Sequence, residues 1–298
     1  MFVLVVHPLP YTLAQKPNVS GSYNCVVFRM DDIQDYYASD AQIAAMNLFM
    51  SKGQPLSLGI IMNGTREDLK IIEKVAEGAK NGSFELGIHG WNHEDFTELS
   101  LSEQKSTLQM ANEKMMKMFG NRSDIFVEPK GLFNNDTIKA MENLGFRISS
   151  SIVSSENSFD GGRSIFNYTH SVIGDLSNNI KNGSSISDNA TIYHVPGMLA
   201  YTDYQNGKLV KVPIDKIFSA VDDNIKKYGY SVIVFHPNDF LQRDENGTIP
   251  ESSTFNSTEF QDFTRLVDTI LSKNIRIITM SELAGIEPRT YSYFGSAS

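Results

Sequence analysis

The sequence predicts an α/β protein in which a parallel sheet is flanked by helices, and three observations carry this prediction. Short apolar segments alternate seven or eight times with segments of helical periodicity along the 298 residues, which is the pattern of repeated strand–helix–strand units. The apolar segments are nearly continuous, as expected for strands buried on both faces. Polar residues follow several of them, and parallel sheets place their sites at the carboxyl ends of strands.

The composition limits the classes of partner. The chain is 41% hydrophobic and 20% charged, which is typical of a globular protein. A net charge of −9 without any basic stretch argues against nucleic acid as a partner. Cys25 is the only cysteine and lies in an apolar segment, so we expect no disulfide. No segment is long and apolar enough for a membrane span.

The N-terminal segment and the glycosylation sequons favour a secreted or cell-surface protein. Residues 1–23 are interpreted as a signal-like or disordered segment, because residues 11–15 resemble the end of a signal peptide. A high density of Asn-X-Ser/Thr sequons suits a glycosylated protein. These sequons begin at Asn18, Asn63, Asn81, Asn121, Asn135, Asn167, Asn182, Asn189, Asn246 and Asn256.

The first half of the chain contains five predicted strands and four predicted helices. Each helix shows apolar residues at helical spacing and is followed by a glycine within two residues, which is a common helix stop. The predicted strands are 26–30, 56–62, 84–88, 125–127 and 146–153. The predicted helices are 40–51, 66–80, 100–119 and 134–144.

The second half begins with a stretch rich in Ser, Asn and Gly, which we interpret as a surface insertion at about 154–190. The regular pattern then resumes, so we expect one domain at 24–285 followed by a tail at 286–298. The predicted strands are 191–195, 231–235 and 275–279, and the predicted helices are 214–228 and 255–272.

Three strand ends carry the chemistry. Asp31 and Asp32 follow the first strand, a His-x-x-x-His pair at 89 and 93 follows the third, and His236 follows a late one. Adjacent carboxylates repel each other unless a cation neutralises them. Imidazoles and a carboxylate suit a divalent transition metal. Each group alone also fits a structural role, such as Asp32 capping a turn, but their joint placement favours a metal site.

These motifs resemble those of the polysaccharide deacetylase family, also called the NodB-homology family, over residues 24–283. The family's first motif, an apolar strand that ends in paired aspartates, resembles residues 28–32. Its second, a His-x-x-x-His after a strand, resembles residues 89–93. Its third, a strand with a Pro-x-Gly turn, resembles residues 127–131, and its last, a strand that ends in histidine, resembles residues 232–236.

The resemblance implies a distorted (β/α)7 barrel of the glycoside hydrolase/deacetylase type and a metal-dependent hydrolase of acetylated glycans. It implies that Asp32, His89 and His93 bind the metal, usually zinc, with Co²⁺, Fe²⁺ or Ni²⁺ as alternatives. It also implies that Asp31 is the general base and His236 the general acid. Candidate substrate-binding residues are Trp91, Lys130, Gly131 and His194, with a structural role for His194 as the alternative.

The mechanism implied is also chemically consistent for an amide bond. A cation lowers the pKa of water toward 7 and polarises a carbonyl group, and an amine leaves only when it is protonated. Chitin-like, peptidoglycan-like and exopolysaccharide substrates are all compatible with the sequence, as is an O-acetylated xylan.

The third motif departs from the family pattern. Relatives commonly carry an arginine at its start that pairs with the base aspartate, but this position is Val127 here. We expect Lys130 to supply the missing charge to Asp31 or to contact the substrate, although a lysine cannot reproduce a bidentate arginine. Arg29, on the strand before the carboxylates, is a weaker substitute in this interpretation.

Three other functions compete with a glycan deacetylase. A small-amide amidohydrolase would use the same barrel with a more closed pocket. A non-haem iron oxygenase would use two histidines and a carboxylate, but it normally has an all-β fold. A catalytically silent carbohydrate-binding protein would use the same scaffold, and the intact set of motif residues argues against it.

Overall fold

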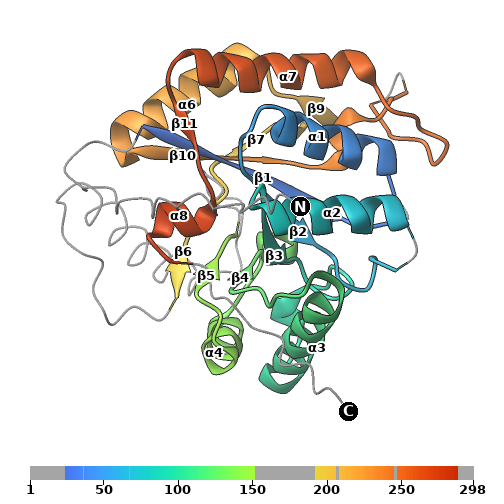
Figure 1. Cartoon of the computed structure of the whole chain (residues 1–298), viewed down its shortest axis with the longest axis vertical. Coiled ribbons are helices and arrows are strands. Elements are labelled where there is room, and N and C mark those ends of the chain that lie inside the picture. The colour runs from blue at the N-terminus through green and yellow to red at the C-terminus, as the bar shows by residue number, and fades with distance from the viewer. Residues whose placement is uncertain are drawn as a thin grey trace, which may run out of the picture.

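The computed structural model describes residues 24–35, 37–66, 68–151, 192–205, 208–244 and 247–287. Its centre is a curved sheet of parallel strands in the order β6-β5-β4-β3-β2-β1-β10-β7 (Figure 1). A further strand, β11, pairs with the amino-terminal end of β1. The predicted α/β class with a parallel sheet is therefore confirmed. The N-terminal segment, the insertion and most of the tail lie outside the described residues.

Helices cover the sheet, with α3 and α4 at one end of the view and α6 and α7 at the other (Figure 1). The strands are β1 Cys25–Ile33, β2 Leu56–Ile60, β3 Phe84–Ile88, β4 Ile125–Phe126, β5 Ile148–Ser149, β6 Tyr193–His194, β7 Leu199–Ala200, β10 Tyr230–Phe235 and β11 Arg276–Ile277. The helices are α1 Ser39–Ser51, α2 Leu69–Asn81, α3 Leu101–Phe119, α4 Asn135–Leu144, α6 Ile214–Tyr228, α7 Ser257–Ser272 and α8 Met280–Ala284.

Local capping explains where the helices begin and end. Ser100 and Glu103 form a reciprocal capping box at the start of α3, and Gly120 ends this helix with a positive φ of 73°. Helix α2 begins at Leu69 and not at 66 as predicted, because the Asp68 side chain accepts the first backbone N–H groups. Among the described helices, none is long and apolar enough to cross a membrane.

The two faces of β1 have different surroundings because successive side chains alternate between them. Val26, Phe28 and Met30 belong to the apolar core that includes residues of α1, α2 and α7. Val27 belongs to a second apolar cluster built from β1, β4, β5 and β10 on the inner face of the curved sheet. Arg29 follows Val27 on this inner face, so the polar residues of the site begin where the row of apolar side chains on β1 ends.

Other parts of the fold also differ from the prediction, among them the short strand β7, which was not predicted. β1 continues through both aspartates to Ile33, whereas we expected it to end at Met30. An antiparallel hairpin of β8 Thr202–Gln205 and β9 Lys208–Lys211, as well as α8, was not predicted. These elements are short, and in β9 exposed Lys208 and Val210 alternate with partly buried Leu209 and Lys211, so the hairpin carries little of the apolar signal on which the prediction rests.

Candidate active site

A bulge in β1 separates the surroundings of the two neighbouring aspartates. Met30 pairs with Leu58 of β2, but Ile33 pairs with Ile60, so β1 carries one extra residue here. Asp32 has a positive φ of 61°, which aspartate adopts more readily than most residues. Asp31 is 2% exposed, whereas the Asp32 side chain is 27% exposed. One carboxylate is therefore buried in the barrel and its neighbour faces the site opening.

His89 follows β3 and directs one ring nitrogen toward Asp32. Its Nδ1 lies 2.8 Å from the carbonyl oxygen of Val127, which fixes the tautomer by making Nδ1 the donor. Its Nε2 lies 3.3 Å from Asp32 Oδ1. A backbone carbonyl in this place is a common partner of metal-ligating histidines.

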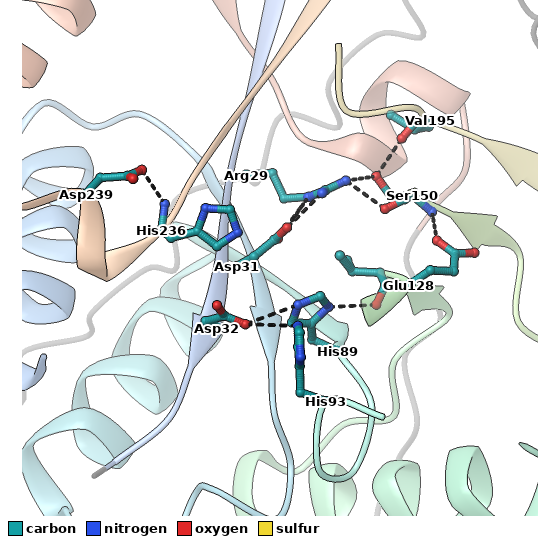
Figure 2. A network of polar contacts seen from close by, with 11 residues as sticks. Arg29, Asp31, Asp32, His89, His93, Glu128, Ser150, Val195, His236 and Asp239 are labelled. Carbon is teal, nitrogen blue, oxygen red and sulfur yellow. Dashed lines mark hydrogen bonds and ion pairs between the residues drawn. The ribbon is translucent and has the colours of Figure 1, made fainter. Parts of the chain in front are cut away.

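His93 reaches the same carboxylate oxygen from the loop that follows β3. Its Nε2 lies 3.5 Å from Asp32 Oδ1, and its φ is 61°. Glu94 holds the loop in shape by accepting the backbone N–H groups of Trp91 and Asn92 at 3.0 and 2.8 Å. The tight turn that results brings both imidazoles to one side (Figure 2).

Asp32, His89 and His93 fit a divalent metal ion. One ligand atom from each residue lies within 4.8 Å of the other two. A tetrahedral zinc ion about 2.1 Å from its ligands would hold them about 3.4 Å apart, which is close to the two Asp32–imidazole distances. Asp32 Oδ1 is buried and has no hydrogen-bond partner among the described residues, as expected for an oxygen that faces a cation.

The carboxylates of this group favour a positive charge beside them because, although burial would lower the pKa of His89, the contact with Asp32 and the charges of Asp31 and Asp32 raise it. Burial would raise the pKa of Asp32, but its close contact with the His89 ring and the charge of that ring, helped by His236 and His93, hold it well below its usual range. Burial and the charge of His89 lower the pKa of His93. The carboxylate is therefore ionised and His93 neutral at neutral pH, which is the state that binds a metal.

Arg29 forms a buried ion pair with Asp31. Its Nε donates to Asp31 Oδ1 at 2.9 Å and to Oδ2 at 3.1 Å, and its Nη2 donates to Oδ2 at 2.7 Å. The two residues are only 1% and 2% exposed. Burial would raise the pKa of Asp31, but the Arg29 guanidinium, together with His89 and His236, holds it below its usual range. Asp31 is therefore ionised at neutral pH.

This pair corrects the part of our expectation in which Lys130 supplies the charge to Asp31, whereas a contact of Lys130 with the substrate stays a prediction. In the part of the chain that the structure describes, the hydrogen bonds that Asp31 accepts come from Arg29. Arg29 is two residues earlier on the same strand and so lies on the same face, a spacing that the sequence already contained. Lys130 is exposed in the turn Pro129–Gly131 with a φ of 58°. Its charge contributes to the lowered pKa of His93, so it lies on the opening side of the site.

The other side of Arg29 is held by the end of β5. Arg29 Nη1 donates to the carbonyl oxygen and the hydroxyl of Ser150, both at 2.7 Å. The backbone N–H of Ser150 donates to Glu128 Oε2 at 3.0 Å, and the Ser149 hydroxyl donates to Glu128 Oε1. Figure 2 shows this row of contacts from Asp31 to Glu128. Sequence analysis missed Glu128, because a single glutamate after a strand carries no recognisable signal.

His236 follows β10, and strand register places it beside Asp31. Met30 pairs with Phe235 in these parallel strands, so the next residues of the two strands are neighbours (Figure 2). Asp239 accepts the backbone N–H of His236 at 2.8 Å and the hydroxyl of Thr202. Asp239, also missed from the sequence, fixes the turn that holds His236.

The remaining predicted residues fall into two groups. Trp91 is partly buried, with the Lys114 ammonium 5.5 Å from its ring centroid, and Gly131 ends the same turn as Lys130. His194 is 3% exposed, and its Nε2 lies 2.6 Å from the Ser151 hydroxyl. Burial and the charge of Arg29 lower its pKa to about 3. This neutral, buried position favours the structural alternative for His194.

Comparison with known proteins supports the fold and the motifs. The sequence model of the polysaccharide deacetylase family matches residues 54–149, a range that contains the His-x-x-x-His loop and the Pro-x-Gly turn. The predicted resemblance to this family, with its NodB-homology domain, is thus confirmed. No curated protein sequence matches the chain.

Solved structures extend the resemblance over the remaining strands. A putative polysaccharide deacetylase from Mycobacterium smegmatis is 13% identical with a TM-score of 0.58, and the alignment covers 92% of this chain and 95% of that one. The chitin deacetylase of Colletotrichum lindemuthianum is 13% identical with a TM-score of 0.54 and 91% coverage of both chains. A CE4 family pseudoenzyme from Bacillus anthracis is 10% identical with a TM-score of 0.51, covering 88% of this chain and 66% of that one. The predicted distorted barrel is confirmed.

Breaking the Arg29–Asp31 pair should destabilise the protein in a pH-dependent way. Arg29→Met leaves a buried carboxylate without its cation, which typically costs about 3–5 kcal/mol. The wild-type pair stabilises the fold above the unfolded pKa of Asp31, and this stability is lost as pH falls through its lowered folded pKa. In Arg29→Met the guanidinium no longer offsets burial, which raises the pKa of Asp31. The deficit of the variant should therefore be largest near pH 7 and shrink as the pH falls and this carboxyl group becomes neutral. Urea unfolding of the metal-free proteins measures it, and the double variant Arg29→Met/Asp31→Asn should recover part of the loss.

Glu128 should make stability fall as pH rises. Burial raises its pKa from 4.5 to about 7, against the hydrogen bond from Ser149. A raised folded pKa means that the folded state binds the extra proton, so the stabilisation is complete below pH 4.5 and is lost up to about pH 7. In Glu128→Gln, this part of the pH dependence should be absent, and equal slopes for both proteins between these pH values would contradict it.

Proposed function

We propose that this protein is a metal-dependent hydrolase that removes acetyl groups from an N-acetylated or O-acetylated polysaccharide. The observation that carries the proposal is the convergence of Asp32, His89 and His93 on one point, with the buried Asp31–Arg29 pair beside it. The family match and the similarity to a chitin deacetylase support the same class of reaction.

In this proposal Asp32, His89 and His93 hold the metal, for which zinc is favoured by the two imidazoles and the carboxylate, with Co²⁺, Fe²⁺ and Ni²⁺ as alternatives. A bound divalent cation would supply the positive charge that lowers the pKa of water and polarises the acetyl carbonyl. The hydrogen bond between His89 Nδ1 and the Val127 carbonyl holds the proton of the neutral imidazole on Nδ1, so Nε2 is the ring atom that would bind the cation.

Asp31 acts as the general base. Its carboxylate is kept ionised by Arg29, so it can accept a proton from the attacking water. The pair with Arg29 uses the inward side of the carboxylate and fixes its orientation. A fixed base avoids part of the entropic cost of bringing the reacting groups together.

His236 acts as the general acid. The register of β1 and β10 places it beside Asp31, and an imidazolium can donate a proton near neutral pH. It would protonate the leaving amine, or the leaving alcohol of an ester. The contact of its backbone N–H with Asp239 fixes its position without using the ring.

The proposed substrate contacts come from the loops at the rim of the site, and the proposed cellular location comes from the sequons and the N-terminal segment. Trp91, Lys130 and Gly131 belong to the two loops next to the metal site, and we propose that they contact the glycan; the alternative candidate His194 is buried. The sequons and the signal-like N-terminal segment support a secreted or cell-surface protein acting on an external glycan. The similarity to a pseudoenzyme makes silent glycan binding the second candidate.

Release of acetate from acetylated glycans tests the proposal. Purified protein is incubated with chitin oligomers, peptidoglycan fragments, acetylated exopolysaccharide and acetylated xylan, and the products are weighed by mass spectrometry. We expect loss of acetyl groups from at least one substrate, abolished by a chelator and restored by zinc. Glycan binding without acetate release, under every metal tried, would select the silent binding protein.

His89→Ala should lose metal and activity together. The variant removes one of three protein ligands, and its neighbour Asn92→Ala, which leaves all three ligands in place, is the matched control. Metal content by atomic emission and acetate release are measured on both. Stoichiometric metal in His89→Ala with unchanged affinity would show that the ligands are assigned wrongly.

Asp31→Asn and His236→Asn should keep the metal but lose most of the rate. Removal of a general base or acid typically costs on the order of 100- to 10,000-fold. Because the pKa of Asp31 is lowered, the acid limb of the kcat/KM profile should lie below neutral pH in the wild type. His236→Asn should lose the alkaline limb and keep the acid limb, and an unchanged alkaline limb would exclude His236 as the acid.

A further inference from the structure

Glu128 is a buried carboxyl group that none of the roles above uses. It is 1% exposed and lies between β4 and the turn that carries Lys130. Both of its oxygens are occupied, one by the Ser149 hydroxyl and the other by the Ser150 backbone N–H at 3.0 Å. These contacts fix the position of Ser149 and Ser150 at the end of β5. Glu128 therefore also influences the side chains that Ser150 contacts.

The end of β5 holds Arg29. The Ser150 carbonyl oxygen and hydroxyl each accept from Arg29 Nη1 at 2.7 Å. The same hydroxyl donates to the carbonyl oxygen of Val195, which prevents it from turning away. Arg29 Nε and Nη2 are then directed at Asp31. Since the guanidinium is rigid and planar, fixing Nη1 also fixes the direction of its other donors.

We propose that Glu128 is a positioning residue for the general base, acting through Ser150 and Arg29 on the orientation of Asp31. The proposal rests on the proposed function in one respect, namely that Asp31 takes a proton in the reaction. Every link in the row is a direct contact between buried groups, so a shift of Ser150 is transmitted to Asp31. Glu128 itself does not touch the metal ligands or the opening of the site.

A second carboxyl group, which is partly buried, shows what a purely structural role would be. Glu85, at the start of β3, accepts from the Ser57 hydroxyl at 2.7 Å and from the backbone N–H groups of Met280 and Ser281 at 2.9 Å each. Its contacts are thus of the same kind, but they lie at the amino ends of the strands, away from the site. Variants of Glu85 therefore serve as the matched control.

Three variants separate positioning from packing. Glu128→Met keeps the volume and removes both acceptors. Glu128→Gln keeps an acceptor for the Ser150 N–H and can donate to the Ser149 hydroxyl. Glu85→Met makes the same change in the control residue. We measure unfolding, metal content, kcat and KM on the acetylated glycan that the wild type deacetylates. The solvent exchange of the Arg29 Nε–H is followed by nitrogen-15 NMR.

We expect Glu128→Met to lower kcat roughly 10- to 100-fold, which is the usual cost of losing a group that orients a functional residue from behind. KM and metal content should change little, and exchange of the Arg29 Nε–H should become faster. Glu128→Gln should recover most of kcat, and Glu85→Met should lower stability without lowering kcat. If Glu128→Met does not fold, Ser150→Ala, which removes the hydroxyl acceptor of Arg29, should lower kcat in the same way.

The NMR measurement of Arg29 distinguishes a failure of the positioning role from a failure of the proposed function. If the wild type removes no acetyl groups, the proposed function fails, and the exchange rate of the Arg29 Nε–H still decides whether Glu128 holds Arg29. Wild-type kcat and wild-type exchange in folded Glu128→Met would overturn the positioning role while leaving the deacetylase intact. An equal loss of kcat in folded Glu85→Met would also overturn it, because the effect would then be general.

Discussion

The buried ion pair of Arg29 and Asp31 is the constraint on which the rest of the site depends. A charge pair inside a barrel is tolerated only when its remaining donors and acceptors are satisfied. Ser150 meets this need for Arg29. The neighbouring strand must also leave room, since a Cβ at Gly59 would lie 2.9 Å from Asp31 Oδ1. One pair therefore limits which residues β1, β2 and β5 can carry.

The bulge in β1 gives two chemically identical side chains different roles. In a regular strand, Asp31 and Asp32 would point to opposite faces of the sheet, and Asp32 would enter the helix-facing core. The extra residue and the positive φ of Asp32 turn its carboxylate toward the two imidazoles instead. His93 has a similar backbone conformation, with a φ of 61°. Backbone conformations that few residues adopt thus gather at the candidate metal site, as is common at functional sites.

Sequence alone predicted the fold class and the order of strand ends, because buried parallel strands leave long apolar runs and because glycine marks the helix ends. It also brought Asp32 together with the two histidines, since strands of one parallel sheet end at one edge. It could not predict which cation pairs with Asp31. The identity of this cation depends on which face of β1 each side chain occupies, on the bulge in β1, and on the hydrogen-bond acceptors of Ser150 at the end of β5. Glu128 was beyond prediction for the same reason, since its contacts are with Ser149 and Ser150 at the end of β5, which is distant in the sequence.

The charge beside Asp31 comes from Arg29 on β1 and not from position 127, which follows β4. Position 127, where relatives commonly carry the arginine, is occupied by a valine that packs in the inner apolar cluster. A second arginine at 127 would add a buried cation without a carboxylate to match it, which is strongly unfavourable. Arg29 and Val127 are therefore coupled: the buried carboxylate of Asp31 needs one positive charge, and Arg29 already supplies it.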